Sequence, residues 1–203
     1  MKTLAACAIL TGAASLFLFS ASAIANAATS ATIATPNPPT SSASEVAPAE
    51  LRDVLPEARL AGRAKLSVFG FSIYNASLWV APGFKTVGYE KHGFALELAY
   101  LRNFTSEAIA KRSIGEMRRQ TSISETEEAR WEKAMREAFP DVKPGDRITG
   151  INRPGTGASF LINGKAVGDV RDAEFARLFF GIWLSGASSE PKMRAELVKL
   201  AQP

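Results

Sequence analysis

Residues 59–80 read RLAGRAKLSVFGFSIYNASLWV, two stretches rich in Leu, Val, Ile, Phe and Tyr on either side of Gly70. Such runs are typical of strands, and the glycine between them predicts a tight turn, so residues 59–69 and 71–80 are expected to form a hairpin. Alternation along the second strand predicts one face with Phe71, Ile73 and Trp79 and another with Tyr74, Leu78 and Val80. Both faces are therefore expected to be at least partly covered.

A third strand is predicted over residues 94–102, where large apolar side chains alternate with smaller or polar ones. One face would carry Phe94, Leu96, Leu98, Tyr100 and Arg102. Because Arg102 ends an otherwise apolar face, an unpaired guanidinium there would be costly unless water or an acid meets it. The sequence thus marks Arg102 as a candidate anchor for an acid.

Helices are expected over residues 106–119 and from Ser124, where Glu127 completes a capping box. The second helix has a single apolar stripe of Trp131, Ala134, Met135, Ala138 and Phe139.

Strands follow at residues 146–152 and 157–162, and Asn163-Gly164 predicts a hairpin turn after them. Asp172 caps a helix whose residues 175–184 are apolar nearly all round, so that this helix is expected to be buried. A last helix begins near Pro191. Strands, helices, strands and helices in this order, without βαβ alternation, predict an α+β domain with a largely antiparallel sheet and helices on one side.

The amino terminus has the pattern of a secretory signal. Lys2 precedes an apolar run over residues 4–19, and Ala25-Asn26-Ala27 suits cleavage before Ala28, so residues 1–27 are expected to be a signal peptide of an exported bacterial protein, periplasmic or secreted. The run is short and has no stop-transfer charges after it, which predicts no stable membrane span after cleavage. Residues 28–49, rich in Ala, Ser, Thr and Pro, are expected to be a disordered linker before one folded domain over residues 50–203.

Several kinds of chemistry are not indicated. Cys7 lies in the predicted signal peptide, and the single histidine, His92, has no partners at ligand spacing, so the sequence predicts no metal site, no disulfide and no cofactor. The formal charge of +4 is spread among mixed Lys, Arg, Asp and Glu residues, which argues against a nucleic-acid partner.

Four separated blocks resemble the bacterial chalcone isomerase-like domain. They are residues 69–79 (FGFSIYNASLW), the Tyr100-Leu101-Arg102 strand end, residues 139–146 (FPDVKPGD) and residues 179–184 (FFGIWL). The resemblance implies an open-faced β-sandwich of the chalcone isomerase type, in which a layer of helices covers a large antiparallel sheet and a ligand cleft lies between them. Plant enzymes of this fold close a hydroxychalcone to a flavanone without a cofactor, whereas non-catalytic relatives bind fatty acids.

The polar set of the plant enzymes is mostly missing here. By the resemblance, their first-strand arginine falls at Ala64, next to Arg63, and their second-strand threonine at Tyr74. Their helical tyrosine and asparagine fall at Thr105 and Arg112. Their late hydroxyl falls near Phe180 or Gly181, where no hydroxyl exists. These departures argue against chalcone cyclisation at a useful rate.

Three functions therefore stay open. The first is binding of a small amphipathic acid, such as a fatty acid, between an apolar cleft and a cationic anchor. The second is an isomerase, an intramolecular lyase acting on a phenolic or other conjugated substrate, with no catalytic residue assigned. The third is a periplasmic interaction protein without a small ligand. The candidate ligand-binding residues are Arg102, Tyr74, Arg63, Tyr100, Thr105 and Arg112.

Overall fold

The computed structural model describes residues 46–201, and residues 42–203 cluster as one compact unit. The predicted signal peptide and most of the predicted linker lie outside the described residues. The strands are β1 (Arg59–Val68), β2 (Phe71–Val80), β3 (Phe94–Tyr100), β4 (Arg147–Arg153), β5 (Gly157–Ile162) and β6 (Lys165–Val170). The helices are α1 (Ser106–Met117), α2 (Glu125–Ala138), α3 (Ala173–Leu184) and α4 (Pro191–Leu197), with short 3-10 turns η1 (Ala49–Leu51) and η2 (Tyr89–Lys91). No helix within the described range is long and apolar enough to cross a bilayer.

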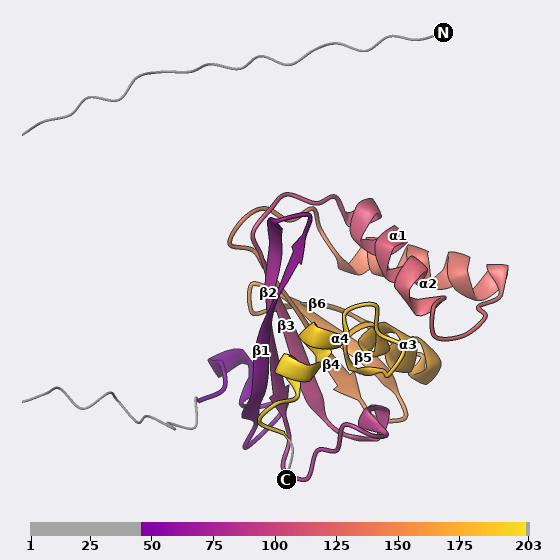
Figure 1. The fold of residues 1–203 in the computed structure, drawn as a ribbon. Helices are drawn as coiled ribbons and strands as arrows, with labels where there is room; N and C mark the ends of the chain where they lie inside the picture. Colours follow the sequence, from indigo (N-terminus) through magenta and orange to yellow (C-terminus); the bar gives the residue numbers. More distant parts are fainter. Residues whose placement is uncertain (1–45, 202–203) are drawn as a thin grey trace, which may run out of the picture. The chain divides into compact units, whose positions relative to one another are not determined.

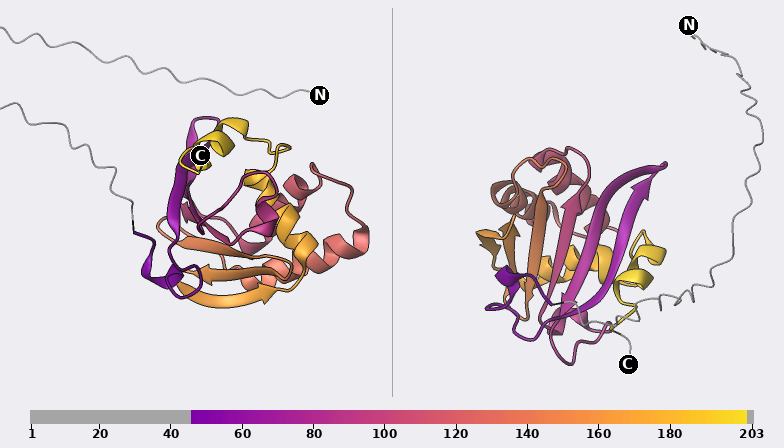
Figure 2. Two further views of the ribbon diagram at one scale, coloured as in Figure 1. Left: turned by 90° about the horizontal axis from the view of Figure 1, so that it is seen from below. Right: turned by 90° about the vertical axis from the view of Figure 1, so that its left-hand side faces the viewer.

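The six strands form one antiparallel sheet in the order of the sequence, and the four α-helices lie over one of its faces (Figures 1 and 2). This arrangement confirms the predicted α+β fold with helices on one side of an antiparallel sheet. The capping box at Ser124 and Glu127 is also present, with the Ser124 N–H donating to the Glu127 carboxylate at 3.0 Å.

Two strands end earlier than the sequence predicts. Phe69 and Gly70 both have positive φ, 49° and 81°, so Phe69 belongs to the turn and β1 ends at Val68. A two-residue turn with positive φ at both positions is of type I′, which matches the twist of a hairpin. At the other site the chain bends after Tyr100, so that Arg102 lies beyond β3.

A bulge in β2 also changes the predicted faces of that strand. Leu66 pairs with Tyr74 and Val68 pairs with Phe71, but only one β1 residue, Ser67, lies between them, so β2 contains an extra residue. Such a bulge shifts the alternation by one residue. Phe71 therefore shares a face with Tyr74, and the predicted grouping of Phe71 with Trp79 is wrong.

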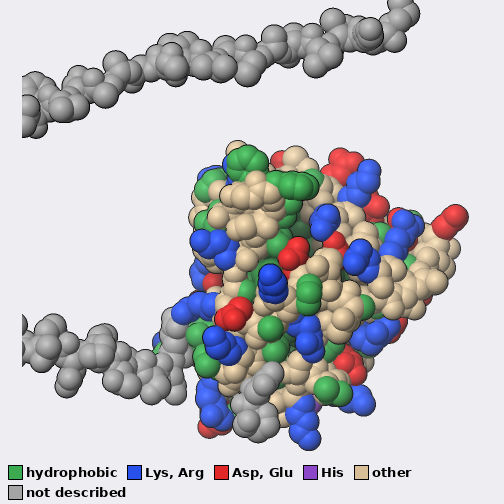
Figure 3. Space-filling model, in the orientation of Figure 1, with side chains coloured by type: hydrophobic (Ala, Val, Ile, Leu, Met, Phe, Trp, Pro, Cys, Tyr) green, Lys and Arg blue, Asp and Glu red, His purple; other side chains and the backbone are tan. Residues whose placement is uncertain are grey.

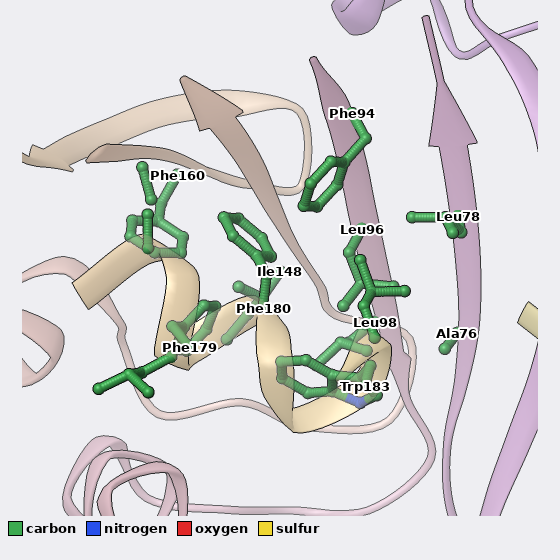
Figure 4. Packing of buried hydrophobic residues seen from close by; sticks show 14 of the residues in the cluster. Ala76, Leu78, Phe94, Leu96, Leu98, Ile148, Phe160, Phe179, Phe180 and Trp183 are labelled. Atoms are coloured by element: carbon green, nitrogen blue, oxygen red, sulfur yellow. The ribbon is translucent and has the colours of Figure 1, made fainter. Parts of the chain in front are cut away.

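Burial of α3 against the sheet forms the centre of the main core. The ring of Phe180, which is fully buried, meets Phe94 of β3 edge to face with ring centroids 4.8 Å apart. Figure 4 shows Phe180 and Trp183 of α3 directed at β3, the strand that carries Leu96 and Leu98. Asp172 fixes the start of this helix, because its side chain accepts hydrogen bonds from the backbone N–H groups of residues 174 and 175 at 3.0 Å.

The opposite face of the sheet is partly covered by the segment that precedes β1. Ala47, Leu51 and Leu55 are buried there against Trp79 and its neighbours. Ala47, which precedes the predicted start of the domain at residue 50, is thus already packed on the sheet.

An ion-pair cluster holds the segment before β1 in place. The Arg147 guanidinium of β4 contacts the Glu97 carboxylate of β3 at 2.7 Å and the Glu50 carboxylate of η1 at 3.0 Å. The cluster therefore joins this segment to two strands of the sheet.

Close approach of α3 to the sheet depends on Gly150 of β4. A Cβ atom at this position would lie 2.9 Å from the Phe180 ring, too close for a carbon contact. We expect Gly150→Ala to lower the free energy of unfolding by about 1–3 kcal/mol, because the buried ring has little room to move. Urea unfolding of residues 42–203 measures this change.

Gly168→Ala in β6 is the matched control, since a Cβ there meets nothing within 4 Å. Its stability should equal or slightly exceed that of the wild type. Equal effects of the two substitutions would contradict the role given to Gly150.

Candidate functional site

Two tyrosines meet on the face of the sheet that the helices cover. Tyr74 of β2 and Tyr100 of β3 are cross-strand partners, and their rings contact edge to face with centroids 5.9 Å apart. The Tyr74 hydroxyl accepts a hydrogen bond from the Trp183 indole N–H of α3 at 3.0 Å. No described residue hydrogen-bonds the Tyr100 hydroxyl. The sheet and the last turn of α3 therefore place two phenols side by side, one of them with an unused hydroxyl.

Both phenols stay neutral at ordinary pH. Burial raises the pKa of Tyr74 to about 12, although the hydrogen bond from Trp183 opposes the shift. Burial also raises the pKa of Tyr100, and the neighbouring Tyr74 adds to that effect. Since a phenolate would be strongly disfavoured, these side chains are suited to donating hydrogen bonds and poorly suited to acting as bases at neutral pH.

Charged side chains near Tyr74 come from α1 and from the residue before α4. Glu190 and Glu116 raise the Tyr74 pKa electrostatically, whereas Arg112 lowers it. Arg112 is mostly exposed and forms an ion pair with Glu116 at 2.6 Å. Figure 3 shows the surface hollowed between the β1–β2 hairpin and α1, with hydrophobic side chains in the hollow. Arg112 thus brings a cation to this region, but one already paired with a carboxylate.

Arg102 lies in a separate, open groove at the end of the sheet. The groove has a volume of about 510 Å³ and is lined by Ile73, Leu101, Arg102, Asn103, Phe104 and Pro144. The guanidinium stacks over the Phe71 ring, 4.6 Å from its centroid, and among the described residues it has no carboxylate partner. Arg102 is exposed, so the expectation that its charge carries a burial cost is wrong, because β3 ends before it.

The groove and the tyrosine pair are connected through Phe104. Its ring lies 5.9 Å from that of Tyr100, and it also lines the groove. Phe71 connects them a second time, since it contacts Arg102 and shares the face of Tyr74. Arg102, Tyr100 and Tyr74 are therefore neighbours within one end of the domain.

The structure does not bring the other two candidates to this place as ligand-binding groups. Arg63 is exposed on the opposite face of β1 and donates to the Ser77 hydroxyl at 3.4 Å, while the next residue, Ala64, faces the helices. The bulge between Leu60 and Gly62 lies too early to reverse this orientation. Thr105 is the N-cap of α1, its hydroxyl accepting from the Ala108 N–H at 3.1 Å.

Sequence reasoning missed the parts played by Trp183 and Phe71. Trp183 belongs to the helix that the sequence predicts to be apolar nearly all round, yet a buried indole N–H needs an acceptor, which is a signal that a polar partner lies nearby. The sequence places Phe71 on the wrong face, because a single-residue bulge leaves no clear mark in the sequence. Within the described part of the chain, no group of three or more His, Cys, Asp or Glu side chains is arranged to hold a metal ion.

Comparison with known proteins defines the class first. The model of the chalcone isomerase-like family matches residues 56–198, most of the folded part, and the chain belongs to that family. A protein of Haemophilus influenzae, described as uncharacterized, is 26% identical over 137 residues, which cover 68% of this chain and 66% of the relative. The match thus spans slightly less than two thirds of that relative.

A solved structure shares the fold. The fatty-acid binding protein of Arabidopsis thaliana superposes with a TM-score of 0.56 at 12% identity, over 71% of this chain and 88% of that one. The likeness confirms the chalcone isomerase type of open-faced sandwich.

The raised pKa of Tyr74 predicts a dependence of stability on alkaline pH. The folded form keeps the proton up to a pKa of about 12, whereas an unfolded tyrosine loses it near the ordinary value of 10.0. The unfolded chain then binds fewer protons, so that the stability contributed by Tyr74 is present below pH 10 and is lost between pH 10 and 12. We expect this loss to approach about 1.4 kcal/mol per pH unit at most.

Urea unfolding of the wild type and of Tyr74→Phe between pH 8 and 11 tests this dependence. Phenylalanine does not titrate, so the free energy of unfolding of the variant should fall less steeply above pH 10. Parallel curves for the two proteins would show that Tyr74 ionises as freely in the folded state as in the unfolded one.

Proposed function

We propose that this chain binds a small amphipathic acid, such as a medium-chain fatty acid, and that Arg102 holds its carboxylate. The observation that carries the proposal is a guanidinium without a carboxylate partner among the described residues, set in a groove whose other walls are mostly apolar. A planar guanidinium offers two parallel N–H donors to a carboxylate. The groove supplies the combination of apolar walls and few polar groups that small-molecule sites favour.

The apolar walls of the groove suit the alkyl chain of such a ligand. Ile73, Leu101, Phe104 and Pro144 surround the space beside Arg102. Behind Phe104 lies Tyr100, whose ring centroid is 5.9 Å from that of Phe104 and whose hydroxyl is unused within the described residues. The Arabidopsis protein of the same fold is named for fatty-acid binding, which supports the choice of ligand class.

Chalcone cyclisation receives less support from the arrangement of the residues. Thr105 is engaged as a helix cap, and Phe180, near the family's late hydroxyl position, is fully buried in the core. Burial also raises the pKa of the Tyr74 phenol, so this group would be a poor base at neutral pH. No catalytic residue is assigned.

Removal of the proposed anchor should weaken acid binding. We expect Arg102→Leu to raise the Kd for decanoate about tenfold or more, since a charge-assisted hydrogen bond contributes about 1.5–3 kcal/mol. The fold should survive, because Arg102 is exposed. Tyr74→Phe should cost less, because it removes one neutral hydroxyl that already accepts from Trp183. Isothermal titration calorimetry on residues 42–203 measures all three proteins.

Arg63→Leu is the matched control, since it removes the same charge from the opposite face of the sheet. Its affinity for decanoate should stay close to that of the wild type. Equal losses in the two arginine variants would point to a general effect of charge, and a wild type that binds no acid would refute the proposal.

We also propose that the chain is exported and processed before Ala28. The support is the signal-like pattern of residues 1–27. Intact-mass spectrometry of the protein from a periplasmic fraction should give a chain beginning at Ala28. A product that retains Met1, or a lipid-modified product beginning at Cys7, would contradict this proposal.

A further inference from the structure

The tip of the β1–β2 hairpin exposes more apolar surface than its fold requires. Phe69 is 96% exposed, Phe71 55% and Val68 38%, and the neighbouring Leu101, whose N–H donates to the Ile73 carbonyl at 2.9 Å, is 37% exposed. We call Val68, Phe69, Phe71 and Leu101 the tip cluster. Figure 3 shows hydrophobic side chains gathered at the top of the molecule, where the hairpin ends. Grouped apolar side chains of this kind mark interaction sites more often than isolated ones do.

The backbone at Phe69 gives a second, independent reason to look for a function. Its φ of 49° lies in the left-handed region, and in a type I′ turn the first position favours Asn, Asp or Gly. A phenylalanine here is therefore unfavourable for the turn, and its exposed ring gains almost nothing from packing. Neither local conformation nor the core accounts for this residue, which points to a contact outside the folded chain.

Two exposed cations lie beside the tip cluster. Lys65 precedes Val68 by three residues on β1, and between Glu57 and Glu90 the sequence contains no acidic residue. Arg102 adds a further cation against the Phe71 ring.

The acidic side chains in the loop before β4, at the same end of the sheet, are engaged in local hydrogen bonds. Asp141 accepts from the Ser106 N–H at 2.8 Å, and Asp146 accepts from the Lys143 N–H at 2.9 Å. Hydrogen bonds from backbone N–H groups favour the ionised form of a carboxylate, so the cations that complement an anionic partner are those beside the tip cluster, Lys65 and Arg102.

We propose that the hairpin tip docks this domain on an anionic lipid bilayer, with the tip cluster entering the headgroup region and the basic side chains meeting lipid phosphates. Aromatic side chains with flanking Lys and Arg are the combination that binds such interfaces. The right-hand view of Figure 2 shows the hairpin reaching past the neighbouring strands, which suits insertion of a narrow tip. A stable protein interface needs about 800 Å² on each partner, more than four side chains offer.

The proposal goes beyond acid binding and does not depend on it. Docking needs the tip cluster and the surrounding charge, whereas acid binding needs the groove beside Arg102. The two sites adjoin, because Arg102 stacks on Phe71 and Leu101 belongs both to the tip cluster and to the groove wall. An acid leaving a membrane at the tip would therefore meet the groove directly.

Phe69→Asn tests the proposal without risk to the fold. Asparagine tolerates positive φ, so the variant should be at least as stable as the wild type by urea unfolding. We expect residues 42–203 to co-sediment with vesicles of phosphatidylglycerol and phosphatidylcholine at low salt, and Phe69→Asn to lower the partition coefficient about tenfold. High salt or vesicles of phosphatidylcholine alone should also reduce binding.

Val87→Asn is the control, because Val87 is equally exposed but lies in the loop at the opposite end of β2. It should leave vesicle binding unchanged, and Phe69→Asn should leave the affinity for decanoate unchanged. The proposal is overturned if the wild type does not bind anionic vesicles, if Val87→Asn is as damaging as Phe69→Asn, or if the tip instead mediates a dimer that Phe69→Asn dissociates.

Discussion

Burial of α3 is the constraint on which the other elements depend. This helix has apolar side chains on nearly every side, so it is stable only when the sheet covers one side and other helices cover the rest. Phe180 faces the sheet, where Gly150 leaves space for its ring and Phe94 contacts it edge to face. Small residues on the helix matter in the same way: a Cβ at Gly181 would lie 2.0 Å from the Gln120 side chain. The sheet, α3 and the chain after α1 therefore fit closely against one another.

The candidate site is a consequence of where that packing ends. Trp183 lies in the last turn of α3, and its indole N–H reaches Tyr74 because the helix axis carries it to the edge of the core. Beyond this point the sheet continues as the β1–β2 hairpin, with less of the helix layer above it (Figure 1). Apolar side chains there are partly or fully exposed, and the open groove of Arg102 lies among them. A ligand or a membrane can reach this end of the domain without disturbing the core.

The two proposed functions use different physical properties of the same end. Acid binding depends on one guanidinium that has no carboxylate partner among the described residues, and so on a specific charge-assisted contact. Membrane docking depends on several exposed apolar side chains and on the cations beside them, Lys65 and Arg102, and neither requires exact geometry. The strained backbone of Phe69 belongs to the second property, since the turn itself would favour another residue.

Much of the fold follows from the sequence alone. Apolar runs on either side of Gly70 located β1 and β2, alternation located β3, the capping residues Ser124 and Asp172 located the starts of two helices, and the apolar side chains all round α3 predicted its burial. These signals are local, since they depend on periodicity and on side chains that hydrogen-bond the backbone a few residues away. The sequence also selects Arg102 and Tyr74 as candidate ligand-binding residues, but it places Arg102 at the end of the third strand, whereas the structure places it beyond that strand. What the tertiary structure decided was the face and the partner of each side chain. The bulge in β2 moved Phe71 beside Tyr74, the bend after Tyr100 brought Arg102 to the surface, and α3 supplied Trp183 from 109 residues away. Such relations arise from pairing and packing between distant segments, which local patterns do not encode.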